Sequence, residues 1–261
     1  MPEEIHGHDQ GALPSPGAPS VPTRKKRFLG RGLPYTDLDN LTGHLLVIEG
    51  SDGVGRTTQI QLLKGWLQVK GFGVLETGWT RSQLVGPTID LAKAGHAMNN
   101  LTYNLLYATD FADRLEHEII PGLRSGFVVL ADRYYYTALA RAAVRNSNIE
   151  WVRSLYGFAI EPDFVVYLEV DVDTLFHRVI MSSGLDYWEA GMDQNPGCDP
   201  YDSFCRFQER LIKEFERLSS FFGFKSVDAR GTVEDIQVEL RKLVGEHLDI
   251  DITREDLIVM R

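Results

Sequence analysis

Short apolar runs alternate with longer amphipathic stretches through the middle of the chain. Five runs with high β propensity are predicted to form strands, at residues 44–49, 73–77, 127–132, 163–170 and 224–229. Several are almost continuous in Val, Leu and Ile, which is typical of strands buried on both faces of a parallel sheet. The clearest helical patterns lie between them, at residues 57–71, 101–126 and 204–223. This alternation predicts an α/β fold with a doubly wound five-stranded parallel sheet and helices on both faces.

The two ends of the chain differ from this central domain, which we assign to residues 41–249. Residues 1–40 are predicted to form a disordered arm, because the opening MPEEIHGHDQGALPSPGAPSVPT is rich in Pro, Gly and Ser. A basic cluster follows at residues 24–27, and it either is a solvated linker or contacts an acidic partner. Residues 250–261 form a short tail that is either docked or frayed.

The composition of the chain narrows the range of possible functions. The chain has 261 residues and a formal net charge of −10, which argues against a broad surface for nucleic-acid polymers but allows a nucleotide in a small pocket. Cys198 and Cys205 have neither a disulfide-framework nor a metal-knuckle spacing, and the histidines form no zinc-ligand pattern. No apolar run approaches the ~20 residues that span a bilayer, and the N-terminus lacks a signal-peptide pattern. We therefore expect a cytoplasmic protein without a membrane segment or a zinc site.

The stretch IEGSDGVGRTT, residues 48–58, matches the phosphate-loop pattern G-x-x-x-x-G-K-[ST] except at Arg56. It follows a predicted strand and opens a predicted helix, where backbone N–H groups and the helix N-terminus attract phosphate. The alternative is a merely tight strand-to-helix turn. We assign ATP phosphate binding to the whole loop: Gly50, Ser51, Asp52, Gly53, Val54, Gly55, Arg56, Thr57 and Thr58. The hydroxyl of Thr57 is expected to bind Mg²⁺.

Arginine at position 56 keeps the positive charge of the usual lysine but changes its shape. Its planar guanidinium binds phosphate through two nitrogens and is bulkier than an ammonium group. Since small misplacements lower rates steeply, we expect nucleotide binding to be retained better than turnover.

A second candidate site follows the predicted strand 127–132, at Asp132-Arg133-Tyr134. Ligands of doubly wound sheets bind at the carboxyl ends of the strands. Asp132 is a candidate to hold Mg²⁺, through water, or to polarise an acceptor, and Arg133 to neutralise a transferring phosphoryl group. The alternative is a simple ion pair at the end of a strand.

Four blocks occur in one order: VIEGSDGVGRTTQ, LLYATDFADRLEHEIIPGLRSGFVVLADRY, DFVVYLEVDVDTLFHRV and the closing segment through VDARGTVEDI. In these blocks the chain resembles the thymidylate kinase family of P-loop nucleoside monophosphate kinases. The resemblance implies ATP as donor, Mg²⁺ as cofactor, a nucleoside monophosphate as acceptor and a homodimer through the long helices. By the same resemblance, Asp52 faces the acceptor sugar and the metal, Arg81 holds the acceptor phosphate and Tyr107 stacks on the acceptor base. The acceptor-binding residues are then Asp52, Arg81, Tyr107, Asp110, Phe111 and Arg133.

Besides Arg56, two features depart from the family pattern. Phe111 stands where the family usually has an arginine that hydrogen-bonds the thymine base, so discrimination by the base edge should weaken. The lid, residues 184–203, has no Lys or Arg and carries acids instead: Asp186, Glu189, Asp193, Asp199 and Asp202. The lid is either a solvated loop, or its acids bind Mg²⁺ or serve an acceptor other than dTMP.

Two functions remain open at this point. The first is an ATP-dependent kinase that phosphorylates dTMP to dTDP, with Arg56, Asp132 and Arg133 as its catalytic residues. The second is a weakly active or inactive nucleotide-binding regulatory or scaffold protein derived from such a kinase.

Overall fold

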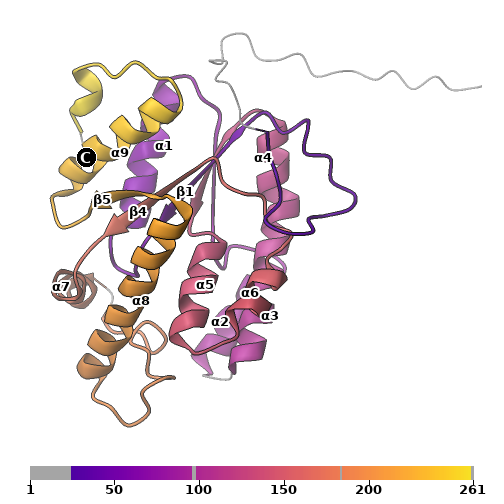
Figure 1. Ribbon diagram of the computed structural model, residues 1–261. Helices are drawn as coiled ribbons and strands as arrows, with labels where there is room; N and C mark the ends of the chain where they lie inside the picture. Colours follow the sequence, from indigo (N-terminus) through magenta and orange to yellow (C-terminus); the bar gives the residue numbers. More distant parts are fainter. Residues whose placement is uncertain (1–24, 96–97, 183, 260–261) are drawn as a thin grey trace, which may run out of the picture.

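The computed structural model describes residues 25–95, 98–182 and 184–259. Within these residues five parallel strands form one sheet in the order β2-β3-β1-β4-β5. The strands are β1 (His44–Glu49), β2 (Val74–Gly78), β3 (Val128–Asp132), β4 (Phe164–Glu169) and β5 (Lys225–Asp228). The predicted strands and fold class are therefore confirmed. β1 lies at the centre, between β3 and β4 (Figure 1).

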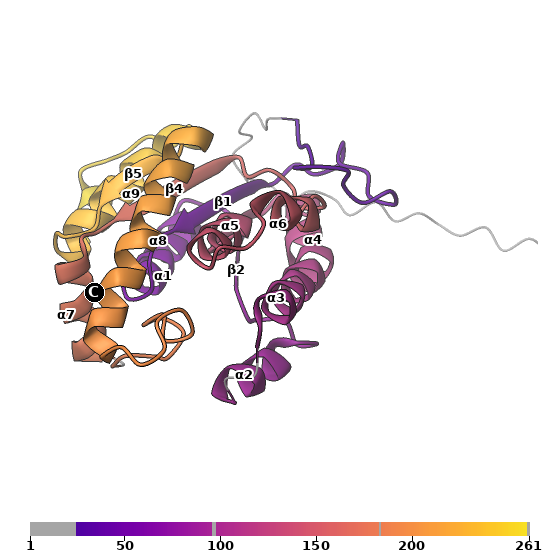
Figure 2. The same ribbon diagram turned by 60° about the horizontal axis from the view of Figure 1, so that its bottom comes forward.

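Helices cover both faces of the sheet (Figure 2). Their bounds are α1 (Arg56–Val69), α2 (Gly86–Ala94), α3 (Asn100–Arg114), α4 (Ile120–Arg124), α5 (Tyr135–Val144), α6 (Ile149–Leu155), α7 (Val172–Ser182), α8 (Pro200–Phe222) and α9 (Val233–His247). A π-helical segment, η1 (Leu115–Ile119), joins α3 to α4, and the 3₁₀ turn η2 (Glu255–Leu257) lies near the C-terminus. The predicted helical stretch 101–126 is thus α3, η1 and α4 together.

Side chains of β1 alternate between two apolar cores. Leu45 and Val47 pack on one face with α3, α5 and much of α8, and Leu46 and Ile48 pack on the other with α1, α7 and α9. All four side chains are almost fully buried. Burial on both faces explains why this strand reads as a continuous apolar run.

The helical patterns singled out above do not include α5. Nine of its ten residues are buried, because the helix packs against α3, α6 and α8. A helix buried on nearly every side has no polar face, so its sequence lacks the periodicity that reveals a surface helix.

The N-terminal boundary differs from the expected one at residue 40. Residues 26–33, which we call the strap, pack onto the domain, while residues 1–24 lie outside the described residues. Lys26 is 5% exposed and pairs with Asp163, and Phe28 forms an antiparallel bridge with Ile160. The buried ion pair of Lys26 and the apolar side chain of Phe28 give the strap enough buried area to dock onto the domain. Residues 26–27 of the basic cluster therefore belong to the docked strap and are not a solvated linker.

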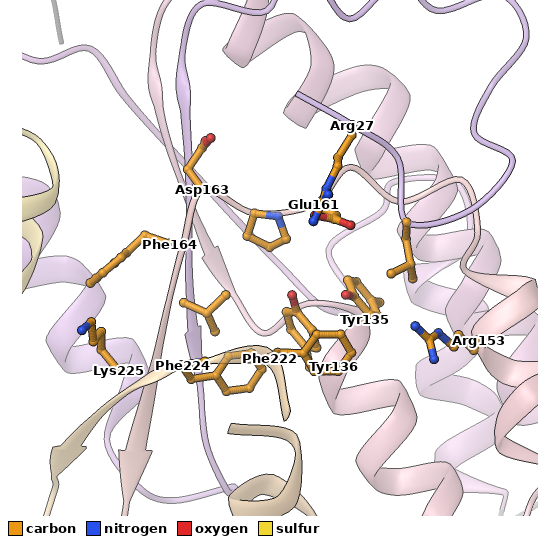
Figure 3. Close-up of a pocket in the computed structure, with 14 residues that line it drawn as sticks. Arg27, Tyr135, Tyr136, Arg153, Glu161, Asp163, Phe164, Phe222, Phe224 and Lys225 are labelled. Atoms are coloured by element: carbon orange, nitrogen blue, oxygen red, sulfur yellow. The ribbon is translucent and has the colours of Figure 1, made fainter. Parts of the chain in front are cut away.

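A cavity of about 430 Å³ opens beside the strap, and Figure 3 shows its lining. Arg27 of the strap pairs with Glu161 at its upper edge, and the hydroxyls of Tyr135 and Tyr136 point toward that pair. None of its lining residues is a predicted site residue.

The C-terminal tail is docked over residues 250–259. The carboxylate of Asp256 accepts hydrogen bonds from Trp66 Nε1 at 2.8 Å and from Lys70 Nζ at 2.7 Å. Arg241 also donates to the backbone oxygen of Asp256 at 2.7 Å.

Of the described helices, none combines the length and the apolar character that a bilayer crossing needs.

Candidate functional site

The phosphate loop joins β1 to α1, in the strand-loop-helix context that its sequence predicts. Gly53 has φ 79°, and a Cβ atom there would lie 2.5 Å from Val179 Cγ2 of α7. Only glycine suits both this left-handed backbone and the close approach of α7. Because α1 begins at Arg56, its free N–H groups face the loop and favour an anion there.

Arg56 is turned inward rather than toward solvent. Its side chain is 9% exposed, Nε donates to Asp132 Oδ1 at 2.7 Å, and Nη1 donates to the carbonyl oxygen of Gly50 at 2.6 Å and to that of Ser51. Burial acts to lower the pKa of Arg56, but the negative charges of Asp132 and Asp52 outweigh it and raise the pKa. The arginine therefore stays cationic and braces the loop from within.

Asp132 ends β3 and faces the loop, as predicted for a residue at the carboxyl end of a parallel strand. Its Oδ2 atom lies 3.3 Å from the hydroxyl oxygen of Thr57. Burial acts to raise the pKa of Asp132, but Arg56 and Arg133 together lower it below its ordinary value. The carboxylate and the hydroxyl are hard oxygen donors of the kind that Mg²⁺ prefers, so the two residues fit the predicted metal site.

The described residues contain no group of three or more His, Cys, Asp or Glu that would hold a metal alone. Mg²⁺ in nucleotide sites is commonly held by one or two protein oxygen atoms together with phosphates and water, a role that Thr57 and Asp132 fit.

Arg133 and Asp52 form the second part of the site. Arg133 has φ 69°, a left-handed conformation that is unfavourable for a residue with a side chain and is typical of functional positions. Its Nη2 donates to Asp52 Oδ1, while Arg141 Nη2 donates to Asp52 Oδ2 at 2.5 Å. Burial acts to raise the pKa of Asp52, but the two arginines outweigh it and hold the pKa well below its usual range.

Arg141 is a site residue that the sequence analysis missed. It lies on α5 and donates from Nη1 to the hydroxyl oxygen of Tyr103 at 3.0 Å, so it links α3 to the phosphate loop. The only available signal was its charge within the apolar run YYTALARAAV, where a buried cation needs a partner.

Tyr107, predicted to stack on the acceptor base, belongs to a group of four rings that we call the aromatic cluster. Its members are Trp79, Tyr103, Tyr107 and Trp188. The ring centroid of Tyr107 lies 4.9 Å from that of Trp79 and 4.4 Å from that of Tyr103, and Tyr107 is 3% exposed. Tyr103 lies one helical turn before Tyr107 on α3, while Trp79 and Trp188 come from separate parts of the chain; none of the three was predicted.

Arg81 lies just beyond β2, where it pairs with Glu76 at 2.7 Å. A Cβ atom on Gly78 would lie 3.0 Å from Arg81 Nε and 3.3 Å from Asp132 Cβ, so the missing side chain leaves room for both groups. The charge of Arg81 contributes to lowering the pKa of Asp132, after the larger effects of burial and of the nearer arginines. The structure thus brings Arg81 to the same edge of the sheet as Asp132.

Asp110 is fully buried and held by protein donors. It accepts from the backbone N–H groups of Thr80, at 3.2 Å, and Ser82, at 3.0 Å, and from Arg114 Nε at 3.0 Å. It therefore shapes the loop that carries Arg81. A direct contact of Asp110 with the acceptor stays a prediction.

Phe111 is also fully buried, and its ring packs against other rings of the core, outside the aromatic cluster. Its ring centroid lies 4.9 Å from that of Tyr134, 5.5 Å from that of Tyr156 and 5.7 Å from that of Phe158. This packing accounts for a phenylalanine at the position without any contact to an acceptor base.

Glu49 joins the phosphate loop to α5. This last residue of β1 is 0% exposed and accepts from the backbone N–H of Tyr134 at 2.9 Å and from Thr137 Oγ1 at 2.6 Å. Burial raises the pKa of Glu49 to about 7, although both hydrogen bonds and the nearby arginines oppose the shift.

Three acids of the lid have partners other than a metal ion. Asp186 Oδ1 accepts from the backbone N–H groups of Trp188, at 2.9 Å, and Glu189, at 3.1 Å, and Asp199 caps α8. Asp193 pairs with Arg145. These contacts favour a docked lid over the hypothesis that its acids bind Mg²⁺.

Comparison with known proteins supplies independent information. A family model described as thymidylate kinase matches residues 48–238. The chain is 36% identical over 211 residues to a probable thymidylate kinase 2 of Saccharolobus solfataricus, covering 80% of this chain and 99% of that protein. It is 36% identical over 207 residues to a probable thymidylate kinase of Staphylothermus marinus, covering 79% and 96%. It is 28% identical over 215 residues to a thymidylate kinase of Caldicellulosiruptor saccharolyticus, covering 80% and 98%.

Proposed function

The chain belongs to the thymidylate kinase family and is therefore a phosphotransferase, and we propose that it transfers the γ-phosphoryl group of ATP to dTMP. The observation that carries this proposal is the meeting of two predicted motifs in one buried network. Arg56 of the phosphate loop binds Asp132 of β3, and the next residue, Arg133, binds Asp52 of the same loop. In this proposal ATP and the acceptor nucleotide both bind at this edge of the sheet.

In this proposal the chain acts by position and charge. The loop amides and the N-terminus of α1 bind the ATP phosphates, and Arg56 adds a fixed positive charge behind them. Arg133 neutralises charge on the phosphoryl group during its transfer, and Asp52 orients Arg133 while facing the acceptor sugar. Thr57 and Asp132 would hold Mg²⁺, which supplies charge neutralisation on the donor phosphates when bound. Arg81 would bind the acceptor phosphate and Tyr107 its base.

A homodimer in the cytoplasm is part of the same proposal. Leu101 and Leu105 on α3 are 60% and 44% exposed, which is compatible with a second copy packing on that helix.

The proposal is tested by a coupled turnover assay with ATP and Mg²⁺ over a panel of nucleoside monophosphates, with ATP binding measured in parallel. We expect turnover with dTMP above that with the other acceptors. Preferred turnover with a different acceptor would contradict the dTMP assignment. ATP binding without turnover on any acceptor would contradict the kinase proposal and favour a nucleotide-binding regulatory role.

One observation favours that second role enough to need its own test. Nε and Nη1 of Arg56 are both engaged inside the protein, with Asp132 and with the loop carbonyls, so they are not aimed at a phosphate. The variant Arg56→Lys separates the alternatives, because a lysine makes fewer of these contacts yet reaches the phosphates. If the site is built around arginine, turnover falls about 10-fold. A rise of several orders of magnitude would mean that activity has decayed in the natural chain.

A further inference from the structure

Arg141 on α5 and Arg145 at the C-terminal cap of this helix lie one helical turn apart. Both contact Tyr103, from two directions. Arg141 donates to the Tyr103 hydroxyl oxygen at 3.0 Å, and the guanidinium carbon of Arg145 lies 5.2 Å from the Tyr103 ring centroid. The same guanidinium lies 4.9 Å from the ring centroid of Phe207 on α8. Arg145 is therefore fixed between two aromatic rings, a favourable arrangement for a cation.

The two arginines reach opposite sides of the site. Arg141 binds Asp52 of the phosphate loop, as described above. Arg145 makes a two-pronged ion pair with Asp193 of the lid, with Nε at 2.9 Å from Oδ2 and Nη2 at 3.2 Å from Oδ1. The side chains of Arg145 and Asp193 are 3% and 14% exposed. A buried pair of this geometry is strong while both partners are present and costly to break.

The lid makes a second contact on the acceptor side. The indole Nε1 of Trp188 donates to the carbonyl oxygen of Lys93 on α2 at 3.0 Å, and Trp188 is 5% exposed. The ring of Trp188 lies 6.3 Å from that of Tyr103. With the lid docked in this way, Trp188 lies against Tyr103, and the ring of Tyr103 in turn packs on Tyr107. The two tyrosines are 5% and 3% exposed.

We propose that Arg145 and Asp193 form a latch that docks the acidic lid onto the acceptor side, and that docking is coupled to binding of the acceptor nucleotide. This inference rests on the proposed function for the identity of the acceptor. The base reaches Tyr107 when the lid is open, and the latch then closes the lid over it. Arg145 acts as a positioning residue, because it orders Tyr103 and the lid. One acid of the lid, Asp193, thus pairs with an arginine of the protein itself.

The first test measures lid docking without any nucleotide. Trypsin has no site between residues 184 and 205, but chymotrypsin cleaves after aromatic residues such as Tyr187 and Trp188 when they become accessible. We expect Asp193→Asn to raise the rate of cleavage within the lid about 10-fold, since it removes the charge of a buried pair. The matched control is Asp186→Asn, which removes the same charge from the same lid but keeps its acceptor oxygen. Equal cleavage rates in the two variants would overturn the latch.

The second test measures the coupling. In the wild-type protein dTMP should slow cleavage of the lid, and Asp193→Asn should weaken equilibrium binding of dTMP about 10-fold, because coupling between two equilibria is reciprocal. In turnover the same variant should raise the KM for dTMP more than it lowers kcat, whereas a loss of folded protein would lower only the apparent kcat. Arg145→Lys should lie between wild type and Asp193→Asn, since it keeps the charge and loses the two-pronged geometry.

Faster cleavage in Asp193→Asn with unchanged dTMP affinity would overturn the coupling, and so would a wild-type lid that dTMP does not protect. Failure of the proposed function has a different signature. A wild-type protein without turnover on any acceptor contradicts the kinase proposal, while proteolysis and equilibrium dTMP binding still decide the latch.

Discussion

The phosphate side and the acceptor side of the site are built in different ways. The phosphate side is one continuous stretch, residues 50–58, and the shortest contacts of Arg56 within it span five and six residues. The acceptor side brings together Trp79 after β2, Tyr103 and Tyr107 on α3, Arg141 on α5 and Trp188 in the lid. The sequence reveals a motif whose contacts are local, and it hides a site to which several separate elements contribute side chains.

The two sides also differ in the groups that they offer a ligand. The phosphate side relies on backbone amides and a helix N-terminus, which any sequence with the right glycines provides. The acceptor side relies on aromatic faces and paired arginines, whose positions depend on packing. Glu49 and Asp52 connect the sides, since each contacts the start of α5 or its preceding residues.

The largest effect should come from cutting the link between the sides at Arg133. Arg133→Ala is expected to lower turnover about 10³-fold, because it removes the cation beside the transferring group. Steady-state kinetics with ATP and dTMP provide the measurement, with folding checked by circular dichroism. Arg153→Ala, at an exposed residue on α6, serves as control and should keep normal activity. Full activity in Arg133→Ala would remove this residue from the mechanism.

A second prediction concerns the buried carboxyl that joins the sides. The pKa of Glu49 is about 7 in the folded protein, against an ordinary value of 4.5. Between these values the unfolded chain loses the proton while the folded protein keeps it, so the free energy of unfolding falls as pH rises. The contribution of Glu49 should fall by about 3 kcal/mol over this window and stay constant above it.

Denaturant unfolding of wild type and Glu49→Gln between pH 4 and 8 measures this contribution. The variant should gain about 3 kcal/mol relative to wild type as pH rises through the window, because glutamine does not ionise. The exposed Glu150→Gln is the matched control and should show no such trend. A difference between wild type and Glu49→Gln that is independent of pH would contradict the raised pKa.

The smallest expected effect lies on the phosphate side. Thr57→Ala should raise the Mg²⁺ concentration needed for half-maximal turnover about 10-fold, since it removes an oxygen ligand beside Asp132. Thr57→Ser keeps the hydroxyl and should behave like wild type. A Mg²⁺ titration at saturating ATP and dTMP decides the point, and identical curves for all three proteins would exclude Thr57 as a ligand.

Some elements of the structure follow from the sequence, and others do not. The five strands are confirmed because buried parallel strands carry dense apolar runs. Asp132 and Arg133 were expected beside the phosphate loop because parallel strands end at one edge of a sheet. The strap was misjudged because its docking depends on Asp163, a residue far along the chain that needs the charge of Lys26. α5 escaped notice because burial on nearly every side removes the polar face that marks a helix.

By itself, the sequence determined the α/β fold, the phosphate loop and the position of Asp132 and Arg133, since these follow from local periodicity and from the order of strands and helices. Only the tertiary structure decided that Arg56 braces the loop from within, that Phe111 belongs to the core, and that Arg141 and Arg145 reach the loop and the lid. Those assignments depend on which side chains meet across long separations. That is settled by packing and by the cost of burying an unpaired charge, which no local pattern encodes.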